Sequence, residues 1–282
     1  LRAIQANGLQ VEAPDGNFTV TPRIATDDPV QVGVVDLVIL GVKAWQVPEA
    51  ARALLPMVGP ETRVMTIQNG VEAPYQVAEV VPPERVIAGA IWGGATRVRP
   101  GCIRHIRPAT EDSHIGQLSL ERAGRTQPVA RIQEILQGAG FRIAIPEDIR
   151  VPLWEKFVGY AGTGPAAACR APLGVFRQVP ESMTLSRQAQ AETVSVARAS
   201  GIALPEDLLE SMERIAKTFP STHMPSAGRD FLTGRPSEVV DFAGSVVRLG
   251  RAAGVPTPVN EFIYAVLLPQ ELKARGQIAW PE

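Results

Sequence analysis

The sequence predicts an α/β protein in which a parallel-sheet domain is followed by an all-helical domain, and two patterns support this prediction. In the first half, short apolar runs alternate with segments of helical spacing. After Pro146, apolar residues recur mainly at intervals of three and four in long segments, which is typical of helices. A chain of 282 residues is long enough for two domains. We place these domains at residues 1–147 and 148–282.

The chain begins with a helix end and a hairpin. "LRAIQANGL" has the pattern of the last turns of a helix that closes at Gly8. Residues 9–20 surround the turn "PDG", in which Gly16 can take the positive φ that a tight turn often requires. This stretch therefore predicts a β-hairpin.

A βαβ unit follows the hairpin. "DLVILGV" (36–42) and "RVMTIQNG" (63–70) are short apolar runs that end in polar residues. "VPEAARALLPMV" (47–58) lies between them, with helical spacing and an early proline. Strands that are apolar on both faces are typical of parallel sheets covered by helices, so we expect these two strands to be parallel.

The remaining elements are predicted from the same periodicities. Further strands are expected at 85–94, 101–106, 113–120 and 141–145, with a helix at 127–140. In the second half, helices are expected at 147–168, 179–201, 205–218, 236–253 and 258–274.

Composition excludes several kinds of partner. Lys and Arg total 28 against 29 Asp and Glu, so the net charge of -1 gives no field that would attract nucleic acid or an anionic membrane. Cys102 and Cys169 lie far apart without metal-ligand spacing, so we expect reduced, structural cysteines and no metal. No run approaches the ~20 apolar residues of a membrane span, and no signal peptide is visible, so we expect a cytoplasmic protein.

Polar residues follow the two strands of the βαβ unit. Lys43 comes directly after the first strand, and the "QNG" triplet with Asn69 ends the second. Ligands of open parallel sheets bind beyond the carboxyl ends of the strands, so both residues are candidate ligand contacts. The alternatives are an ordinary solvated lysine and a simple turn at Asn-Gly.

Lys156 lies in "PLWEKFVGYAGTGPAAA" (152–168), which we expect to start the first helix of the second domain. Large apolar residues flank it on both sides. It is either a lysine that extends its ammonium to water, or a buried lysine whose lowered pKa lets it give a proton to a developing alkoxide.

A further cluster, "STHMPSAGRDFLTGRPSEVVDFAG" (221–244), contains Ser226 and Glu238. The alternative for its second part is purely structural, with Ser237 as a helix N-cap and Glu238 as a first-turn carboxylate. His223 is expected to be a surface or packing residue.

The sequence resembles the ketopantoate reductase (2-dehydropantoate 2-reductase) family over essentially its whole length. The matching pieces are "DLVILGVKAWQ", "TIQNGVEA", "PGCIRHI", "LWEKF" and "FLTGRPSEVVDFAG", in the family's order and at its spacing. The resemblance implies a Rossmann-like NADP-binding domain and a helical substrate and dimerisation domain of the hydroxyacid-dehydrogenase C-terminal type. It also implies NADPH-dependent reduction of a 2-oxo acid, above all 2-dehydropantoate to pantoate in pantothenate biosynthesis, and it would allow a homodimer.

The resemblance also implies roles for the candidate residues. Lys156 would be the catalytic proton donor and would contact the substrate. Lys43, Asn69 and Glu238 would bind NADP, Asn69 would also contact the substrate, and Ser226 would hold the substrate carboxylate. An ammonium beside the ketone oxygen suits this reaction, because hydride transfer to the carbon leaves negative charge on that oxygen.

Two departures from the family pattern lead to alternatives. Tyr160 and Gly164 stand where the family usually has substrate-binding asparagines, so another oxo compound is an alternative substrate. The family's opening strand and G-x-G-x-x-G loop do not precede Leu1. We therefore expect a chain that lacks roughly 30 to 40 N-terminal residues, with a non-catalytic relic or binding protein as the alternative. The sequence leaves the choice between NADPH and NADH open.

Overall fold

A computed structural model describes residues 1–107, 113–118 and 126–281. The chain forms two units. The first consists of Leu1–Val42, Gln46–Gln68 and Ala73–Ile149, and the second of Lys43–Trp45, Asn69–Glu72 and Arg150–Glu282. Two short segments from the first half of the chain therefore belong to the second unit. The predicted boundary between residues 147 and 148 stays a prediction.

The first unit is α/β, and most of its predicted elements are present. Its helices are α1 (Arg2–Asn7), α2 (Val47–Ala53), α3 (Ala73–Ala78) and α4 (Gln127–Gly138). Its strands are β1 (Leu9–Glu12), β2 (Phe18–Val20), β3 (Val35–Leu40), β4 (Val58–Thr66), β5 (Val86–Ala90), β6 (Gly94–Arg99), β7 (Cys102–Arg107), β8 (Ser113–Gln117) and β9 (Ile143–Ala144). The C-terminal end of the strand predicted at 113–120 includes residues 119 and 120, which lie outside the described residues.

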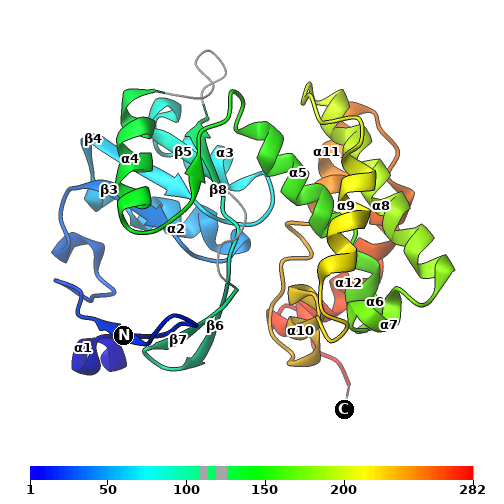
Figure 1. The fold of residues 1–282 in the computed structure, drawn as a ribbon, viewed down its shortest axis with the longest axis horizontal. Coiled ribbons are helices and arrows are strands. Elements are labelled where there is room, and N and C mark those ends of the chain that lie inside the picture. The colour runs from blue at the N-terminus through cyan, green and yellow to red at the C-terminus, as the bar shows by residue number, and fades with distance from the viewer. Residues whose placement is uncertain (108–112, 119–125, 282) are drawn as a thin grey trace. The chain divides into compact units, whose positions relative to one another are not determined.

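The larger sheet has the strand order β3-β4-β5-β8-β9 (Figure 1). The predicted βαβ unit is confirmed, because β3 and β4 are parallel and α2 lies between them in the chain. β5 is also parallel to β4. The predicted parallel sheet is thus present in β3, β4 and β5, and β8 adds an antiparallel strand next to β5. The described chain between β5 and β8 forms strands β6 and β7, without the crossover helix that usually returns a parallel strand.

Both faces of this sheet are covered, as its apolar strands require. One apolar cluster joins Val64 and Val86 of the sheet to α2 and α3, and another joins Met65 and Ile87 to α4. Consecutive strand residues thus point to opposite faces, and each face has its own core. Figure 1 shows α4 on one side of the sheet.

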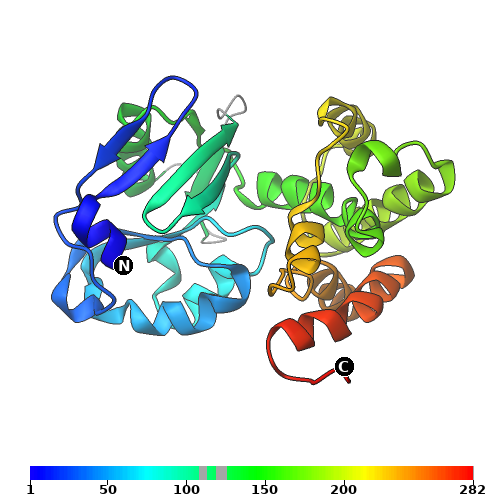
Figure 2. The same ribbon diagram turned by 90° about the horizontal axis from the view of Figure 1, so that it is seen from below.

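A smaller sheet has the order β2-β1-β7-β6 (Figure 2). The predicted hairpin is confirmed by antiparallel pairing of β1 with β2. Helix α1 closes as expected at Gly8, whose φ is 71°. Strand β6 was not predicted, because most of its residues are exposed and Arg97 and Arg99 interrupt any apolar alternation. It forms a strand because it pairs with β7.

The second unit is helical, as predicted. Its helices are α5 (Arg150–Ala161), α6 (Gly164–Cys169), α7 (Leu173–Phe176), α8 (Pro180–Ala199), α9 (Leu208–Thr218), α10 (Ser226–Leu232), α11 (Ala243–Ala253) and α12 (Pro258–Ala274) (Figure 1). Helix α8 packs against α5, α6, α9, α11 and α12. None of the helices in the described chain has both the length and the apolar character needed to span a membrane.

The helix predicted at 236–253 is wrong over its first part. Residues 238–242 form turns, and α11 begins only at Ala243. Ser237 is therefore not the N-cap of an α-helix, and Glu238 does not lie in a first helical turn. The apolar spacing of Val239 and Phe242 led to the wrong prediction of a helix here. Both side chains are buried because the turns pack against the helices of this unit, and neither residue lies on a helix.

Candidate active site

The candidate active site lies in the second unit, and two of its residues come from the short segments of the first half. Lys43 and Asn69 follow the ends of the adjacent parallel strands β3 and β4. Buried Gln68 joins these strand ends, because its Nε2 donates to the carbonyl oxygens of Leu40 at 2.5 Å and Val42 at 3.1 Å. Gln68 belongs to the "QNG" triplet predicted at this strand end, but no role was predicted for its side chain.

Contacts with α11 and α12 hold the two segments. Glu72 accepts hydrogen bonds from Ser245 and from Arg248, the latter at 2.6 Å. The Arg275 guanidinium carbon lies 4.8 Å from the centre of the Trp45 ring, in a cation–π contact. These side chains fix the backbone on which Lys43 and Asn69 are carried.

Lys156 lies in the middle of α5, rather than at its start as expected. Only 6% of the residue is exposed, so the alternative of an ammonium that reaches water is wrong. Burial lowers the pKa of Lys156 from 10.5 to about 8, and the negative charge of Glu238 partly offsets this shift. A lysine with such a pKa can give up its proton near neutral pH.

Glu238 is almost fully buried and receives donors from the Lys43–Trp45 segment. Its Oε1 accepts the backbone N–H of Ala44 at 3.3 Å, and its Oε2 lies 3.3 Å from Lys43 Nζ. Lys43 Nζ also lies 3.3 Å from Asp230 Oδ2. Lys43 is therefore held by two carboxylates, although 42% of its side chain remains exposed. The alternative of an ordinary solvated lysine does not describe it.

Asn69 is brought together with Tyr160. The Tyr160 hydroxyl donates to Asn69 Oδ1 at 2.9 Å. Burial, and then the charge of Glu238, raise the pKa of Tyr160 above its usual value, so the phenol stays a neutral donor. Gly70 has a φ of 93°, so the Asn-Gly pair also makes the turn that it would in the structural alternative.

Ser226 is the first residue of α10 and is half-buried. Asp230, one turn later on the same helix, pairs with Lys43. The role of Ser226 stays a prediction. Sequence reasoning missed Asp230, because a carboxylate on a helix that was itself not predicted gave no distinctive signal.

Sequence reasoning also missed Glu271, which anchors the turns that carry Glu238. Glu271 lies on α12 and is fully buried. Its Oε2 accepts the backbone N–H of Ser237 at 2.8 Å and the Ser237 hydroxyl at 2.6 Å, and its Oε1 accepts Arg275 Nε at 2.6 Å. Ser237 Oγ in turn accepts the N–H of Val239 at 3.2 Å. Glu271 lies in the last turn of α12, in the polar stretch "QELKA", so nothing in the sequence indicated that its side chain is buried.

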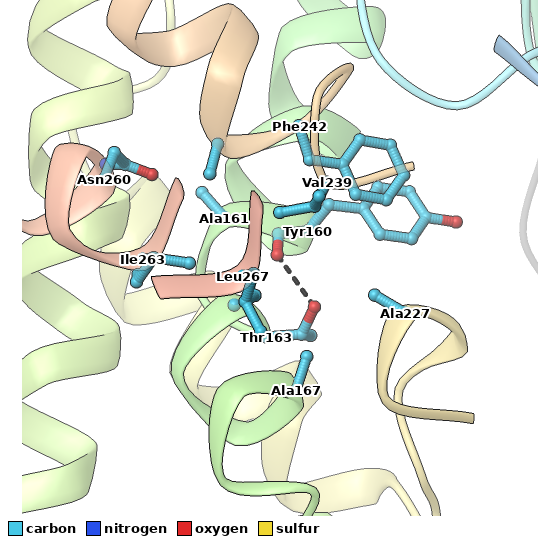
Figure 3. A pocket seen from close by; sticks show the side chains of 12 residues that line it. Tyr160, Ala161, Thr163, Ala167, Ala227, Val239, Phe242, Asn260, Ile263 and Leu267 are labelled. Carbon is cyan, nitrogen blue, oxygen red and sulfur yellow. Dashed lines mark hydrogen bonds between the residues drawn. The ribbon is translucent and has the colours of Figure 1, made fainter. Parts of the chain in front are cut away.

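A small cavity adjoins Tyr160 (Figure 3). Its volume of about 20 Å³ is enough for one water molecule. Its lining is Tyr160, Ala161, Thr163, Gly164, Ala167, Ala227, Val239, Phe242, Ala243, Asn260, Ile263 and Leu267. Apart from Thr163, Asn260 and the Tyr160 hydroxyl, these side chains are apolar. Among the described residues, no group of His, Cys, Asp and Glu side chains could hold a metal ion.

Two family models match the chain, one in each half. The model of "Ketopantoate reductase PanE/ApbA" matches residues 1–119, and that of "Ketopantoate reductase PanE/ApbA C terminal" matches residues 148–271. The chain belongs to the ketopantoate reductase family. A 2-dehydropantoate 2-reductase of Halobacterium salinarum is 30% identical to it over 261 residues, which are 92% of this chain and 84% of the relative.

Solved structures agree with this membership of the ketopantoate reductase family. A PanE/ApbA family ketopantoate reductase from Ralstonia eutropha is 28% identical, with a TM-score of 0.87 over 97% of this chain and 88% of that one. A D-mandelate dehydrogenase solved with NADH and anilino(oxo)acetate shares the fold at 19% identity, with a TM-score of 0.81 over 97% of this chain and 88% of that one. The first family model matches from residue 1, so the expected loss of an N-terminal strand and loop is not supported.

Proposed function

We propose that this ketopantoate reductase family protein uses NADPH to reduce the ketone of a 2-oxo acid, with 2-dehydropantoate as the first candidate substrate. Residues 1–147 would form the cofactor domain, and residues 148–282 the substrate and dimerisation domain. The observation that carries the proposal is the buried ammonium of Lys156, whose pKa of about 8 suits a proton donor. The name of the Halobacterium salinarum relative supports the choice of 2-dehydropantoate.

The reaction adds a hydride to the ketone carbon and a proton to its oxygen, and the product is a 2-hydroxy acid. When bound, the dinucleotide supplies the hydride. Lys156 Nζ gives the proton, and its positive charge stabilises the oxygen as negative charge develops there. The negative charge of Glu238 raises the pKa of Lys156, against the lowering caused by burial, and so keeps a larger fraction of the lysine protonated. Ser226 would bind the substrate carboxylate.

The residues near Lys43 fit the nicotinamide and ribose end of the cofactor. Lys43 and Asn69 follow the carboxyl ends of parallel strands, where such ligands bind in open sheets. Lys43 remains 42% exposed although two carboxylates hold it, so its ammonium can contact a ligand. The Glu238 carboxylate can accept from a ribose hydroxyl or a carboxamide.

The deciding experiment follows NADPH consumption by the purified protein with a panel of 2-oxo acids that includes 2-dehydropantoate and is repeated with NADH. We expect turnover of at least one 2-oxo acid, with NADPH preferred. A protein that reduces none of them with either cofactor would remove the proposal.

The pH dependence of kcat/KM should show an alkaline limb near pH 8. Lys156 must be protonated to act as an acid, and its pKa is about 8, so kcat/KM should fall as the pH rises through that value. Asp241, whose pKa burial and then Glu238 raise to about 6, titrates on the acid side and cannot cause this limb. Steady-state rates from about pH 6 to 10 measure the profile. A flat profile through about pH 8 contradicts the assignment of Lys156.

Lys43→Met should raise the KM for NADPH by about tenfold and leave kcat closer to normal. A cation that positions the cofactor acts in the ground state and the transition state alike, so its loss weakens binding more than turnover. Lys217→Met is the matched control, because Lys217 is 68% exposed and pairs with Glu213 on the same surface helix. Equal NADPH affinity in the two variants would remove Lys43 from the cofactor site.

A further inference from the structure

The wall next to the proton donor is aromatic. Tyr160 lies one helical turn after Lys156 on α5, so the two side chains project from the same face of the helix. Lys156 Nζ lies 5.8 Å from the centre of the Tyr160 ring. A substrate whose ketone oxygen contacts Lys156 therefore places the group attached to its ketone carbon near this ring.

The phenol of this wall is hydrogen-bonded within the protein. The Tyr160 hydroxyl donates to Asn69 Oδ1 at 2.9 Å, so the amide oxygen is engaged. The Tyr160 ring stacks on Phe242, with 4.9 Å between ring centres and 21° between ring planes. In Figure 3 the two rings lie side by side, and the Tyr160 hydroxyl points away from Ile263 and Leu267. The faces of the two rings thus present carbon rather than hydrogen-bonding groups.

The region behind the two rings is apolar apart from Thr163 and Asn260, whose buried Oδ1 has no hydrogen-bond partner among the described residues. The small cavity there is bounded by the rings and by alanine, valine, isoleucine and leucine side chains. Gly164 also lines the cavity, and it packs closely against Ile263, because an added Cβ would lie 3.3 Å from two carbons of that side chain. Asn260 lines the cavity on the side away from the rings in Figure 3, and its Nδ2 donates to Ala189 and Glu192.

Resting on the proposed reduction of a 2-oxo acid, we propose that Tyr160 and Phe242 select 2-oxo acids whose group beyond the ketone is apolar. 2-Dehydropantoate, the candidate that the name of the relative suggests, would then be a substrate of this site but a poorer one, because its group beyond the ketone carries a hydroxyl. A substrate hydroxyl placed against this wall loses its hydrogen bonds to water, and the faces of the two aromatic rings do not replace them. An apolar group of the same shape loses no hydrogen bond there. A hydrophobic site discriminates against an added hydroxyl by up to about 100-fold, so a preference of about 10- to 100-fold is expected.

Two substrates that differ by one hydroxyl test the proposal. Trimethylpyruvate has the carbon skeleton of 2-dehydropantoate without its terminal hydroxyl. The wild-type protein should show a kcat/KM about 10- to 100-fold higher for trimethylpyruvate. Tyr160→Asn replaces the ring by an amide and should reduce this ratio by at least about tenfold. Tyr160→Phe keeps the ring, removes only the hydrogen bond to Asn69 and should keep the preference.

The outcomes separate this proposal from the proposed function. If the wild-type protein reduces neither substrate with NADPH or NADH, the proposed function fails. If it reduces both but prefers 2-dehydropantoate, only the selectivity proposal fails. A selective loss of 2-dehydropantoate reduction in Tyr160→Phe would show that the phenol binds the substrate hydroxyl. That result would also overturn the selectivity proposal. If Tyr160→Asn does not fold, the ratio of kcat/KM for trimethylpyruvate to that for 2-dehydropantoate, measured in the wild-type protein and in Tyr160→Phe, still tests the selectivity proposal.

Discussion

Lys156→Met is expected to lower kcat and kcat/KM together by ~10² or more, because general acid catalysis commonly contributes that much. Methionine keeps the apolar stem that packs inside the helical unit and removes only the ammonium. The loss should therefore appear in the transition state and not in cofactor binding. Steady-state kinetics measure the first effect, and fluorescence titration with NADPH measures the second.

The same variant has an internal control in its pH dependence. If Lys156 causes the alkaline limb near pH 8, the residual activity of Lys156→Met should no longer show that limb. Folding should be unimpaired, since removal of a buried charge relieves its desolvation cost. Near-normal turnover in this variant would show that another group donates the proton.

Glu271→Ala is expected to lower the free energy of unfolding by about 3 to 5 kcal/mol. The substitution leaves the partly buried Arg275 without its carboxylate partner and the buried N–H and hydroxyl of Ser237 without their acceptor. Loss of one partner of a buried ion pair is costly, because the remaining charge is still removed from water. Urea unfolding followed by circular dichroism measures the change.

Glu261→Ala is the matched control for this prediction. Glu261 lies on the same helix, is 47% exposed at its side chain and pairs with Arg251 at 3.5 Å. An exposed ion pair contributes about 0 to 1 kcal/mol, so this control should change little. If the two variants lose equal stability, burial of Glu271 is not the reason for its contribution to stability.

The folded fraction of Glu271→Ala should also have a reduced kcat, because the turns that hold Glu238 lose their contact with Glu271.

Elements with a strong local pattern were predicted well. Helix α12 spans the predicted residues 258–274, because Pro258 marks a helix start and apolar residues recur at helical spacing after it, although Pro269 lies inside the helix. The hairpin around Gly16 was predicted for a similar reason, since its turn residues are adjacent in the chain. Strand β6 and helix α10 were missed, because contacts with other segments stabilise them rather than their own periodicity.

The sequence by itself determined the α/β-then-helical order, the βαβ unit and the candidate residues, since apolar spacing and turn chemistry act over a few neighbouring residues. Only the tertiary structure decided which of these residues meet. Lys43 pairs with Glu238 across 195 positions, and Asn69 with Tyr160 across 91. Such contacts depend on how helices and strands pack, and packing is a property of the whole core. Tertiary structure likewise decided that Lys156 is buried, which is the physical cause of its lowered pKa.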